Sequence, residues 1–229
     1  MRKQTGFTLI EIAIVLVIIG LLLGGVLKGQ ELITSARVRN LISQQEGIKA
    51  AYFGFLDRYR ALPGDYDRGG VNITGVAGST CNAGNGNGNG RIELGGAESE
   101  TILAWEHLSK AGFINGSFNC NAVESAATTP TNPFAVRLQM VWDNVFDDTV
   151  APVIARHNLK SGGQIPSDLL AEVDRKVDDG SATGGSFRFS AYNGGAGVPV
   201  GSGSCYLAVA PQTWSAATVI ANCGAATLF

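Results

Sequence analysis

An apolar run near the amino terminus constrains this chain more than any other feature. Between Phe7 and Leu27 the only charged side chain is that of Glu11. A helix of this length can span a bilayer core of about 30 Å, and two basic residues among the first three predict a cytoplasmic amino terminus. We therefore expect a membrane-spanning helix over residues 7–28.

Glu11 is unusual inside such a run. A carboxylate at the centre of a spanning helix costs roughly 2.5–3.5 kcal/mol on insertion scales, and such residues usually have a function and a partner. An ordinary secretory signal would be cut after its apolar stretch, but the nearest small-residue site, at 34–36, lies well beyond this stretch. The pattern therefore argues against removal of the apolar segment.

The residues GFTLIE at 6–11, followed by an unbroken apolar helix, resemble the prepilin leader and first helix of bacterial type IV pilins and type II secretion pseudopilins. The resemblance implies that residues 1–6 are a leader, that a prepilin peptidase cuts between Gly6 and Phe7, and that Phe7 is then N-methylated. Glu11 becomes the fifth mature residue, which matches the glutamate of the family. In a filament it would pair with the terminal amine of a neighbouring subunit, because a buried charge is tolerated only when paired.

The same resemblance implies a location and partners. The chain would wait in the bacterial inner membrane as a single-pass protein, and an inner-membrane assembly platform would move it into a homo- or heteropolymeric filament in the periplasm or at the cell surface. Its function would be that of a structural subunit, and its length and large insert favour a minor or specialised pilin. A type II secretion pseudopilin is the alternative within the family. The alternative of another class is a membrane-anchored binding or adhesion module, with or without calcium dependence, that never polymerises.

The helix is expected to continue beyond the membrane as an amphipathic half over residues 29–60. Apolar side chains recur there at helical spacing, and the first proline, expected to stop the helix, is Pro63. Glycines weaken its middle by about 1 kcal/mol each relative to alanine. Small residues of this kind allow close packing between helices. The alternative is a segment that melts on assembly, as the resemblance to the family implies, although the usual family proline is absent here. These glycines are Gly20, Gly24, Gly25 and Gly29.

Residues 61–229 are expected to form a globular head of class α+β, in which the long helix packs on an antiparallel sheet. Two further helices are predicted, one at 98–111 with Ile102, Trp105 and Leu108 in the core, and one at 166–180 with Ser167 as its cap. Alternating apolar residues predict three strands, at 134–142, 186–192 and 205–211.

Four motifs in the head resemble a subset of prepilin-like proteins. They are LPGD at 62–65, the Asn/Gly-rich loop, AWEHLSKAG at 104–112 and DRKVDDG at 174–180. His107 in the third motif has no partner at ligand spacing, so we expect it to be structural. The carboxylates of the fourth motif, on Asp174, Asp178 and Asp179, fit either a cation site or a solvated helix end.

The Asn/Gly-rich loop has two interpretations. Asn85, Asn87 and Asn89 fall at alternate positions before a glycine, as the ligands of an EF-hand-like calcium loop do. All three are neutral amides, however, and the twelfth position is Gly96, so that Glu93 or a later glutamate would have to complete the site. A plain Gly/Asn loop needs no ligand. Calcium is therefore possible, and no cofactor is required.

Four cysteines fit two disulfides in an oxidising compartment. Pairing by proximity joins Cys81 to Cys120 and Cys205 to Cys223, and the second bridge would close a carboxy-terminal loop as in many pilins. The crossed pairings remain open.

Nothing in the sequence indicates an enzyme or a specific nucleic-acid partner. The net charge of −2 does not provide a nucleic-acid surface. The two histidines, His107 and His157, are not in an H-E-x-x-H motif, and no serine lies in G-x-S-x-G. We expect no catalytic site.

Overall fold

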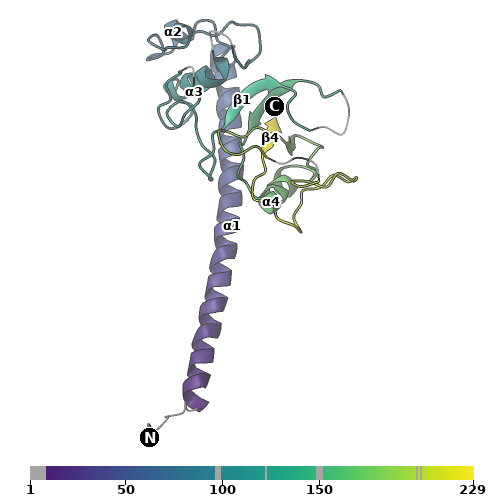
Figure 1. Cartoon of the computed structure of the whole chain (residues 1–229). Helices are drawn as coiled ribbons and strands as arrows, with labels where there is room; N and C mark the ends of the chain where they lie inside the picture. Colours follow the sequence, from purple (N-terminus) through teal and green to yellow (C-terminus); the bar gives the residue numbers. More distant parts are fainter. Residues whose placement is uncertain (1–8, 96–98, 122, 148–151, 200, 202) are drawn as a thin grey trace. The chain divides into compact units, whose positions relative to one another are not determined.

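The computed structural model describes residues 9–95, 99–121, 123–147, 152–199, 201 and 203–229. It divides into two compact units, Met1–Arg37 and Val38–Phe229, which are treated separately below. The second unit carries the sheet and the shorter helices (Figure 1).

The long amino-terminal helix is confirmed as α1 (Leu9–Tyr59). Within the first unit its large apolar side chains are exposed, from Leu9 at 92% onward. The helix ends where Arg60 takes a positive φ of 54°. The expectation that Pro63 stops it is wrong, because the left-handed residue ends the helix before the proline is reached.

The second unit contains a four-stranded antiparallel sheet in the order β1-β2-β4-β3. Leu159 of β2 pairs with Met140 of β1 on one side and with Thr227 of β4 on the other. The strands are β1 (Gln139–Asp143), β2 (Arg156–Lys160), β3 (Phe187–Phe189) and β4 (Ala225–Leu228).

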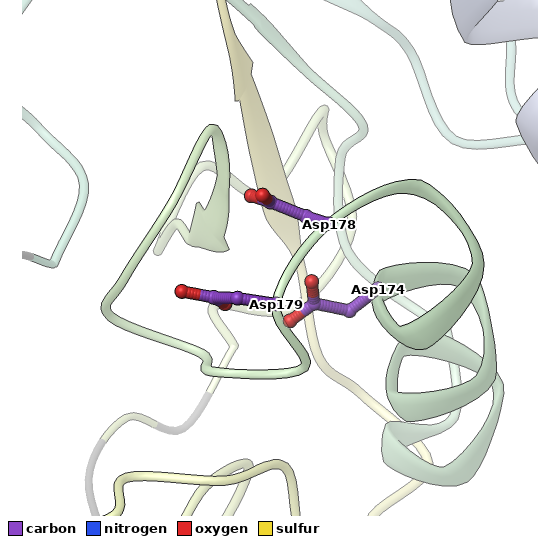
Figure 2. Close-up of side chains that lie close together, drawn as sticks. All are labelled: Asp174, Asp178 and Asp179. Carbon is purple, nitrogen blue, oxygen red and sulfur yellow. The ribbon is translucent and has the colours of Figure 1, made fainter.

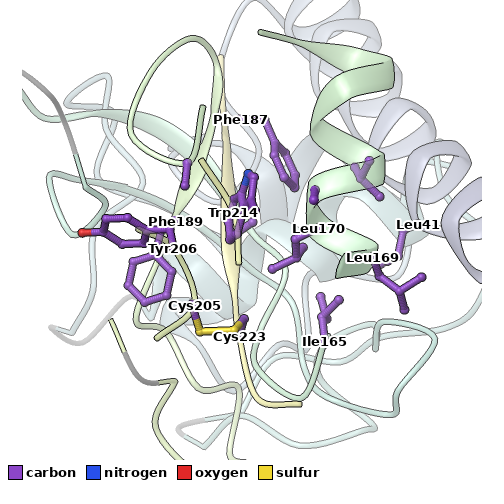
Figure 3. Packing of buried hydrophobic residues seen from close by; sticks show 14 of the residues in the cluster. Leu41, Ile165, Leu169, Leu170, Phe187, Phe189, Cys205, Tyr206, Trp214 and Cys223 are labelled. Carbon is purple, nitrogen blue, oxygen red and sulfur yellow. A yellow bond between two sulfur atoms is a disulfide. The ribbon is translucent and has the colours of Figure 1, made fainter. Parts of the chain in front are cut away.

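The part of α1 that belongs to the second unit packs on one face of this sheet. Tyr52 and Phe55 share a buried cluster with Met140 and Leu159. Lower on the same helix, Leu41 joins a second cluster with α4 (Ser167–Val177), β3 and the Cys205–Cys223 bridge (Figure 3). The predicted α+β class, with the long helix on an antiparallel sheet, is therefore confirmed.

The opposite face of the sheet buries an ion pair. Side chains alternate between faces along a strand, so Asn158 and Lys160 lie across from the face that Leu159 covers. Lys160 is 2% exposed, and its Nζ donates a hydrogen bond to Asp143 Oδ2. Asn158 Nδ2 donates to Asp143 Oδ1 at 3.0 Å. Burial lowers the pKa of Lys160, and the Asp143 carboxylate opposes that shift.

The shorter helices lie close to their predicted positions. α3 (Glu100–Lys110) corresponds to the predicted 98–111 helix, and its Ile102, Trp105 and Leu108 are buried as expected. α4 matches its predicted segment, but Ser167 is not its cap. The cap position is Pro166, and the Ser167 hydroxyl instead donates to Ser215 O at 2.6 Å. Two single-turn elements, α2 (Gly69–Asn72) and η1 (Asn82–Gly84), lie in the expected loop.

The predicted strands are only partly right. Of the segment 134–142 only the part from Gln139 onward is strand. The residues before it form a turn, in which Asn132 Oδ1 accepts the N–H groups of Phe134 and Val136. Ala135 in this turn has a φ of 61°. The segment 186–192 shortens to β3, and 205–211 is not a strand. β2 and β4 were not predicted, because RHNLK is too polar and AATL too short to show an alternating apolar pattern.

Two disulfides brace the irregular parts of the second unit. They join Cys81 to Cys120 and Cys205 to Cys223, across 39 and 18 residues of chain, which are the pairings that proximity favours. Loops of this size correspond to about 3–4 kcal/mol each in the chain-entropy account. The first bridge packs against Ile102 and Leu103 of α3 in one buried cluster.

The carboxy-terminal part of the sequence is electrically neutral. After Arg188 the chain contains no Asp, Glu, Lys, Arg or His through Phe229. Several apolar side chains of this stretch are exposed nevertheless, among them Val198 at 65% and Val209 at 78%.

The buried ion pair leads to a stability prediction. Asp143→Ala leaves the Lys160 ammonium buried without its carboxylate, and we expect a loss of about 3–5 kcal/mol in the free energy of unfolding. Urea denaturation of the full chain in detergent, followed by tryptophan fluorescence, measures it. The control is Glu172→Ala, which removes a partly exposed partner of Lys176 and should cost at most about 0.5 kcal/mol. Equal, small effects of both variants would contradict the prediction.

Candidate functional site

The predicted processing residues, Gly6 and Phe7, lie outside the described residues. The predicted assembly residue, Glu11, lies in the first turn of α1, where a negative charge is stabilised by the helix dipole. The structure places it on an exposed apolar segment. α1 is long and apolar enough to cross a membrane by length and composition.

The second unit places the four predicted calcium residues in one loop, but most of their oxygens already accept hydrogen bonds. Asn85 Oδ1 accepts from Gly70 N at 3.1 Å, and Asn87 Oδ1 accepts from Asn89 N at 3.0 Å. The Asn89 amide spans the turn, because its Oδ1 accepts a main-chain N–H and its Nδ2 donates to Glu93 Oε2 at 2.9 Å. The loop therefore has a defined shape without an ion.

Two buried carboxylates hold this loop from inside. Asp65 is 4% exposed and Glu100 is 1% exposed. Asp65 accepts the N–H of Asn89 at Oδ1 (2.9 Å) and that of Gly90 at Oδ2 (2.8 Å). Glu100 accepts main-chain N–H groups on both oxygens, from residues 87 and 93, each at 3.0 Å. Each buried carboxylate thus binds two main-chain N–H groups of the loop.

Burial shifts the pKa of each of these two carboxyls. It raises the pKa of Asp65 and of Glu100, and the N–H donors of the loop oppose that shift. The negative charge of Glu93 raises both pKa values further, and that of Asp65 also raises the pKa of Glu100. The main-chain N–H donors are therefore what favours the charged form of both carboxyls.

His107 joins the LPGD turn to the same loop. It is fully buried, its Nδ1 accepts the N–H of Gly64 at 3.0 Å, and its Nε2 lies 3.0 Å from Gly84 O. This pattern requires the neutral ring with the proton on Nε2, because Nδ1 is an acceptor. Burial lowers the pKa of His107 to about 4. His107 is therefore structural, as the sequence suggested.

Glu106 completes the contribution of α3. Its Oε2 accepts the Ser79 hydroxyl at 2.6 Å and the main-chain N–H of Cys120 at 3.1 Å. α3 therefore supplies Glu100, Glu106 and His107 to three parts of the loop region. This explains why three of the motifs noted in the sequence occur together: they form one hydrogen-bonded assembly.

The fourth motif forms a separate acidic group (Figure 2). Carboxylate oxygens of Asp174, Asp178 and Asp179 lie within 4.8 Å of one another. Asp174 is buried and accepts Trp214 Nε1 at 2.7 Å, and burial raises its pKa to about 6. Asp178 accepts the main-chain N–H of Phe187 at 2.8 Å. These two carboxylates are thus bound to the chain itself, and the group carries no argument for a cation.

Sequence reasoning did not identify Asp65, Glu100 and Glu106 as the residues that hold the loop. The sequence signal for the two glutamates was their place in the helix predicted at 98–111, whose Ile102, Trp105 and Leu108 were expected in the core. For Asp65 the signal was the adjacent Gly64, whose φ is 86° and whose position admits no side chain, because a Cβ there would collide with Glu100 O.

The buried histidine gives the fold a pH dependence. The pKa of His107 is about 4 in the folded chain and about 6.5 in the unfolded chain. The neutral ring therefore contributes fully to the free energy of unfolding above pH 6.5. This contribution is lost as the pH falls towards 4, by up to about 3 kcal/mol. We expect His107→Gln to lower the free energy of unfolding at pH 7 and to flatten its decrease between pH 6.5 and 4.

The quantity to measure is the difference in the free energy of unfolding between wild type and His107→Gln at each pH. The raised pKa of Asp174 changes the free energy of unfolding in the opposite direction over the same pH range, and this effect cancels in the difference. His157→Gln is the comparison variant: burial lowers the pKa of that partly buried ring also to about 4, so it should flatten the pH slope similarly, but its Nε2 has no partner in the described structure, so it should cost less stability at pH 7. An unchanged pH slope in His107→Gln would contradict the prediction.

Calcium binding at Asn85, Asn87, Asn89 and Glu93 stays a prediction with a direct test. If an ion joins these residues, millimolar calcium should raise the Tm of the full chain and a chelator should reverse the change, because a ligand of the folded state stabilises it by mass action. Differential scanning calorimetry measures this, with magnesium as the control ion. An unchanged Tm would remove calcium from the loop.

Comparison with known proteins bears on the amino-terminal segment. The family model described as "Prokaryotic N-terminal methylation motif" matches residues 1–27, which include Gly6, Phe7 and Glu11. No curated protein and no solved structure matches the chain. At residues 1–27 the chain thus carries the N-terminal methylation motif that is the hallmark of type IV pilins and pseudopilins.

Proposed function

We propose that this chain is a structural subunit of a type IV pilus-like filament, in the role of a minor or specialised pilin. The observation that carries the proposal is the methylation motif at residues 1–27, which is continuous with a helix long and apolar enough to span a membrane. The motif implies processing by a prepilin peptidase and assembly with other pilins. A type II secretion pseudopilin carries the same motif and is the alternative within the class.

Cleavage between Gly6 and Phe7 would leave a free, methylated amino group at the tip of an apolar helix. That amine is positively charged, and an unpaired charge in an apolar filament core would cost several kcal/mol. Glu11 supplies the one carboxylate in the apolar run. Pairing the amine of one subunit with Glu11 of its neighbour satisfies both charges and fixes the axial register between subunits.

The apolar surface of α1 has to stay out of water at both stages of this proposal. Between Leu9 and Leu27 the accessible fractions of the exposed large apolar side chains range from 45% to 92%. Burial of each Leu, Ile or Val is worth about 1.5–3 kcal/mol, either in a lipid bilayer before assembly or against the same helix of other subunits afterwards. Repetition of one such contact between identical subunits gives an open helical polymer.

The deciding experiment is Glu11→Ala in the native host. We expect the variant to insert in the membrane and to be cleaved, but to fall at least about tenfold in sheared filaments, because the terminal amine loses its buried partner. Membrane fractionation, the intact mass of the processed chain and quantification of filaments measure the three steps. The matched control is Glu31→Ala, which removes an exposed carboxylate paired with Lys28 on the same helix and should assemble normally.

Filaments at the wild-type level with Glu11→Ala would overturn the pairing mechanism. A wild-type chain that is never found in filaments, or whose mass shows no cleavage before Phe7, would contradict the pilin assignment and favour a membrane-anchored binding module. Recovery in a secretion pseudopilus rather than a pilus would select the alternative within the class.

A further inference from the structure

Three consecutive Asn-Gly pairs occupy positions 85–90, inside the loop that Asp65 and Glu100 hold. In an Asn-Gly pair the main-chain nitrogen of glycine can attack the side-chain carbonyl carbon of asparagine, because glycine has no Cβ to hinder the approach. The attack forms a C–N bond, closes a succinimide ring and releases the side-chain nitrogen as ammonia. Water then opens the ring to aspartate or isoaspartate. One water is consumed, one ammonia is released and a neutral side chain becomes a carboxylate.

In the structure all three attacking nitrogens are engaged as hydrogen-bond donors. Gly86 N donates to Tyr66 O at 2.9 Å. Gly88 N donates to the main-chain oxygen of Asp65 at 2.9 Å, and Gly90 N donates to Asp65 Oδ2 at 2.8 Å. An N–H in such a bond must break it before its nitrogen can reach the asparagine side chain. Loss of the proton next to the Asp65 carboxylate is also opposed by repulsion between like charges.

The loop cannot avoid this chemistry by replacing its glycines. A Cβ at Gly86 would collide with the main chain at Gly64 and Asp65. Gly88 and Gly90 have φ values of 71° and 82°, which favour glycine. The backbone therefore requires the reactive pairs, and protection has to come from the hydrogen bonds of the folded loop.

We propose that residues 85–90 are a deamidation site gated by the loop: Tyr66 protects the first Asn-Gly pair and Asp65 the other two while the loop is closed, and the pairs deamidate when it opens. The reaction is one-way. Asn89 Nδ2 donates to Glu93 Oε2 at 2.9 Å in the closed loop. After deamidation a carboxylate takes the place of that donor and faces another carboxylate, so the modified loop is disfavoured in its closed form. This inference is independent of the proposed function.

The chain contains its own reference for this reaction. Asn115-Gly116 lies in an exposed turn, and among the described residues Gly116 N has no hydrogen-bond acceptor. It should therefore deamidate close to the rate of an unstructured peptide. The sequence context of Asn115 is comparable with that of Asn89, because the rate of deamidation is set mainly by the glycine that follows asparagine.

The first test compares Asn89 with Asn115 in the wild-type full chain in detergent at mildly alkaline pH. Peptide mapping by mass spectrometry follows the gain of about 1 Da at each site. We expect Asn115 to react at least about tenfold faster than Asn89, which corresponds to a loop-opening free energy of at least about 1.4 kcal/mol. In urea with reductant the two sites should react at similar rates.

The second test removes the protecting side chain. Asp65→Ala should raise the rate at Asn89 towards that of Asn115 and leave Asn115 unchanged. Asp67→Ala is the matched control, because Asp67 is an exposed carboxylate beside Gly88 that accepts no hydrogen bond from the described part of the loop. It should leave all sites at their wild-type rates.

The proposal is overturned if native Asn89 reacts as fast as Asn115, since the closed loop would then give no protection. It is also overturned if the difference between the sites persists in urea, because local sequence would then be its cause. The comparison of native and unfolded wild type decides this even if Asp65→Ala does not fold.

Discussion

Buried carboxylates that accept main-chain N–H groups are the constraint on which the second unit depends. Much of this unit is irregular backbone, whose donors have no partner in a helix or sheet. Asp65 and Glu100 satisfy the Asn/Gly loop, and Asp174 and Asp178 satisfy the segment after α4. Burial raises the pKa of the first three, which shows that the chain accepts a desolvation penalty to satisfy these donors. The neutral ring of His107 has the same function at the LPGD turn.

Much of the fold could be predicted from sequence because its signals are local and periodic. The long helix begins as a continuous apolar run and continues with apolar residues at helical spacing, and α3 shows a buried face through Trp105 and Leu108. The sheet was harder, because β2 and β4 obtain their strand conformation from pairing with each other rather than from an alternating pattern of their own. Ser167 shows the same limit: a serine before a helix suggests a cap, but its hydroxyl is used by a residue distant in sequence.

The candidate sites also differ in how far they can be recognised from the sequence. The processing motif and Glu11 are recognised from a short contiguous pattern, and the family model matches that pattern. The residues that hold the Asn/Gly loop are far apart along the chain and become a group only when α3 lies against it. Sequence spacing left two interpretations of the asparagine side chains, as calcium ligands or as part of a plain loop, and calcium binding stays a prediction. The structure shows them as turn-forming groups whose shape depends on Asp65, a residue that the spacing rule does not include.

The electrically neutral stretch after Arg188 has a consequence for any contact made by the carboxy-terminal part of the chain. Salt weakens interactions between charges by screening them, but it does not screen the burial of apolar surface. Exposed Val198, Leu207 and Val209 belong to this stretch, so an association through them would persist as ionic strength changes and would strengthen under salting-out conditions. The charged surface of the same unit comes from earlier residues, which would respond in the opposite way. The two parts of the sequence thus respond differently to the ionic composition of their surroundings.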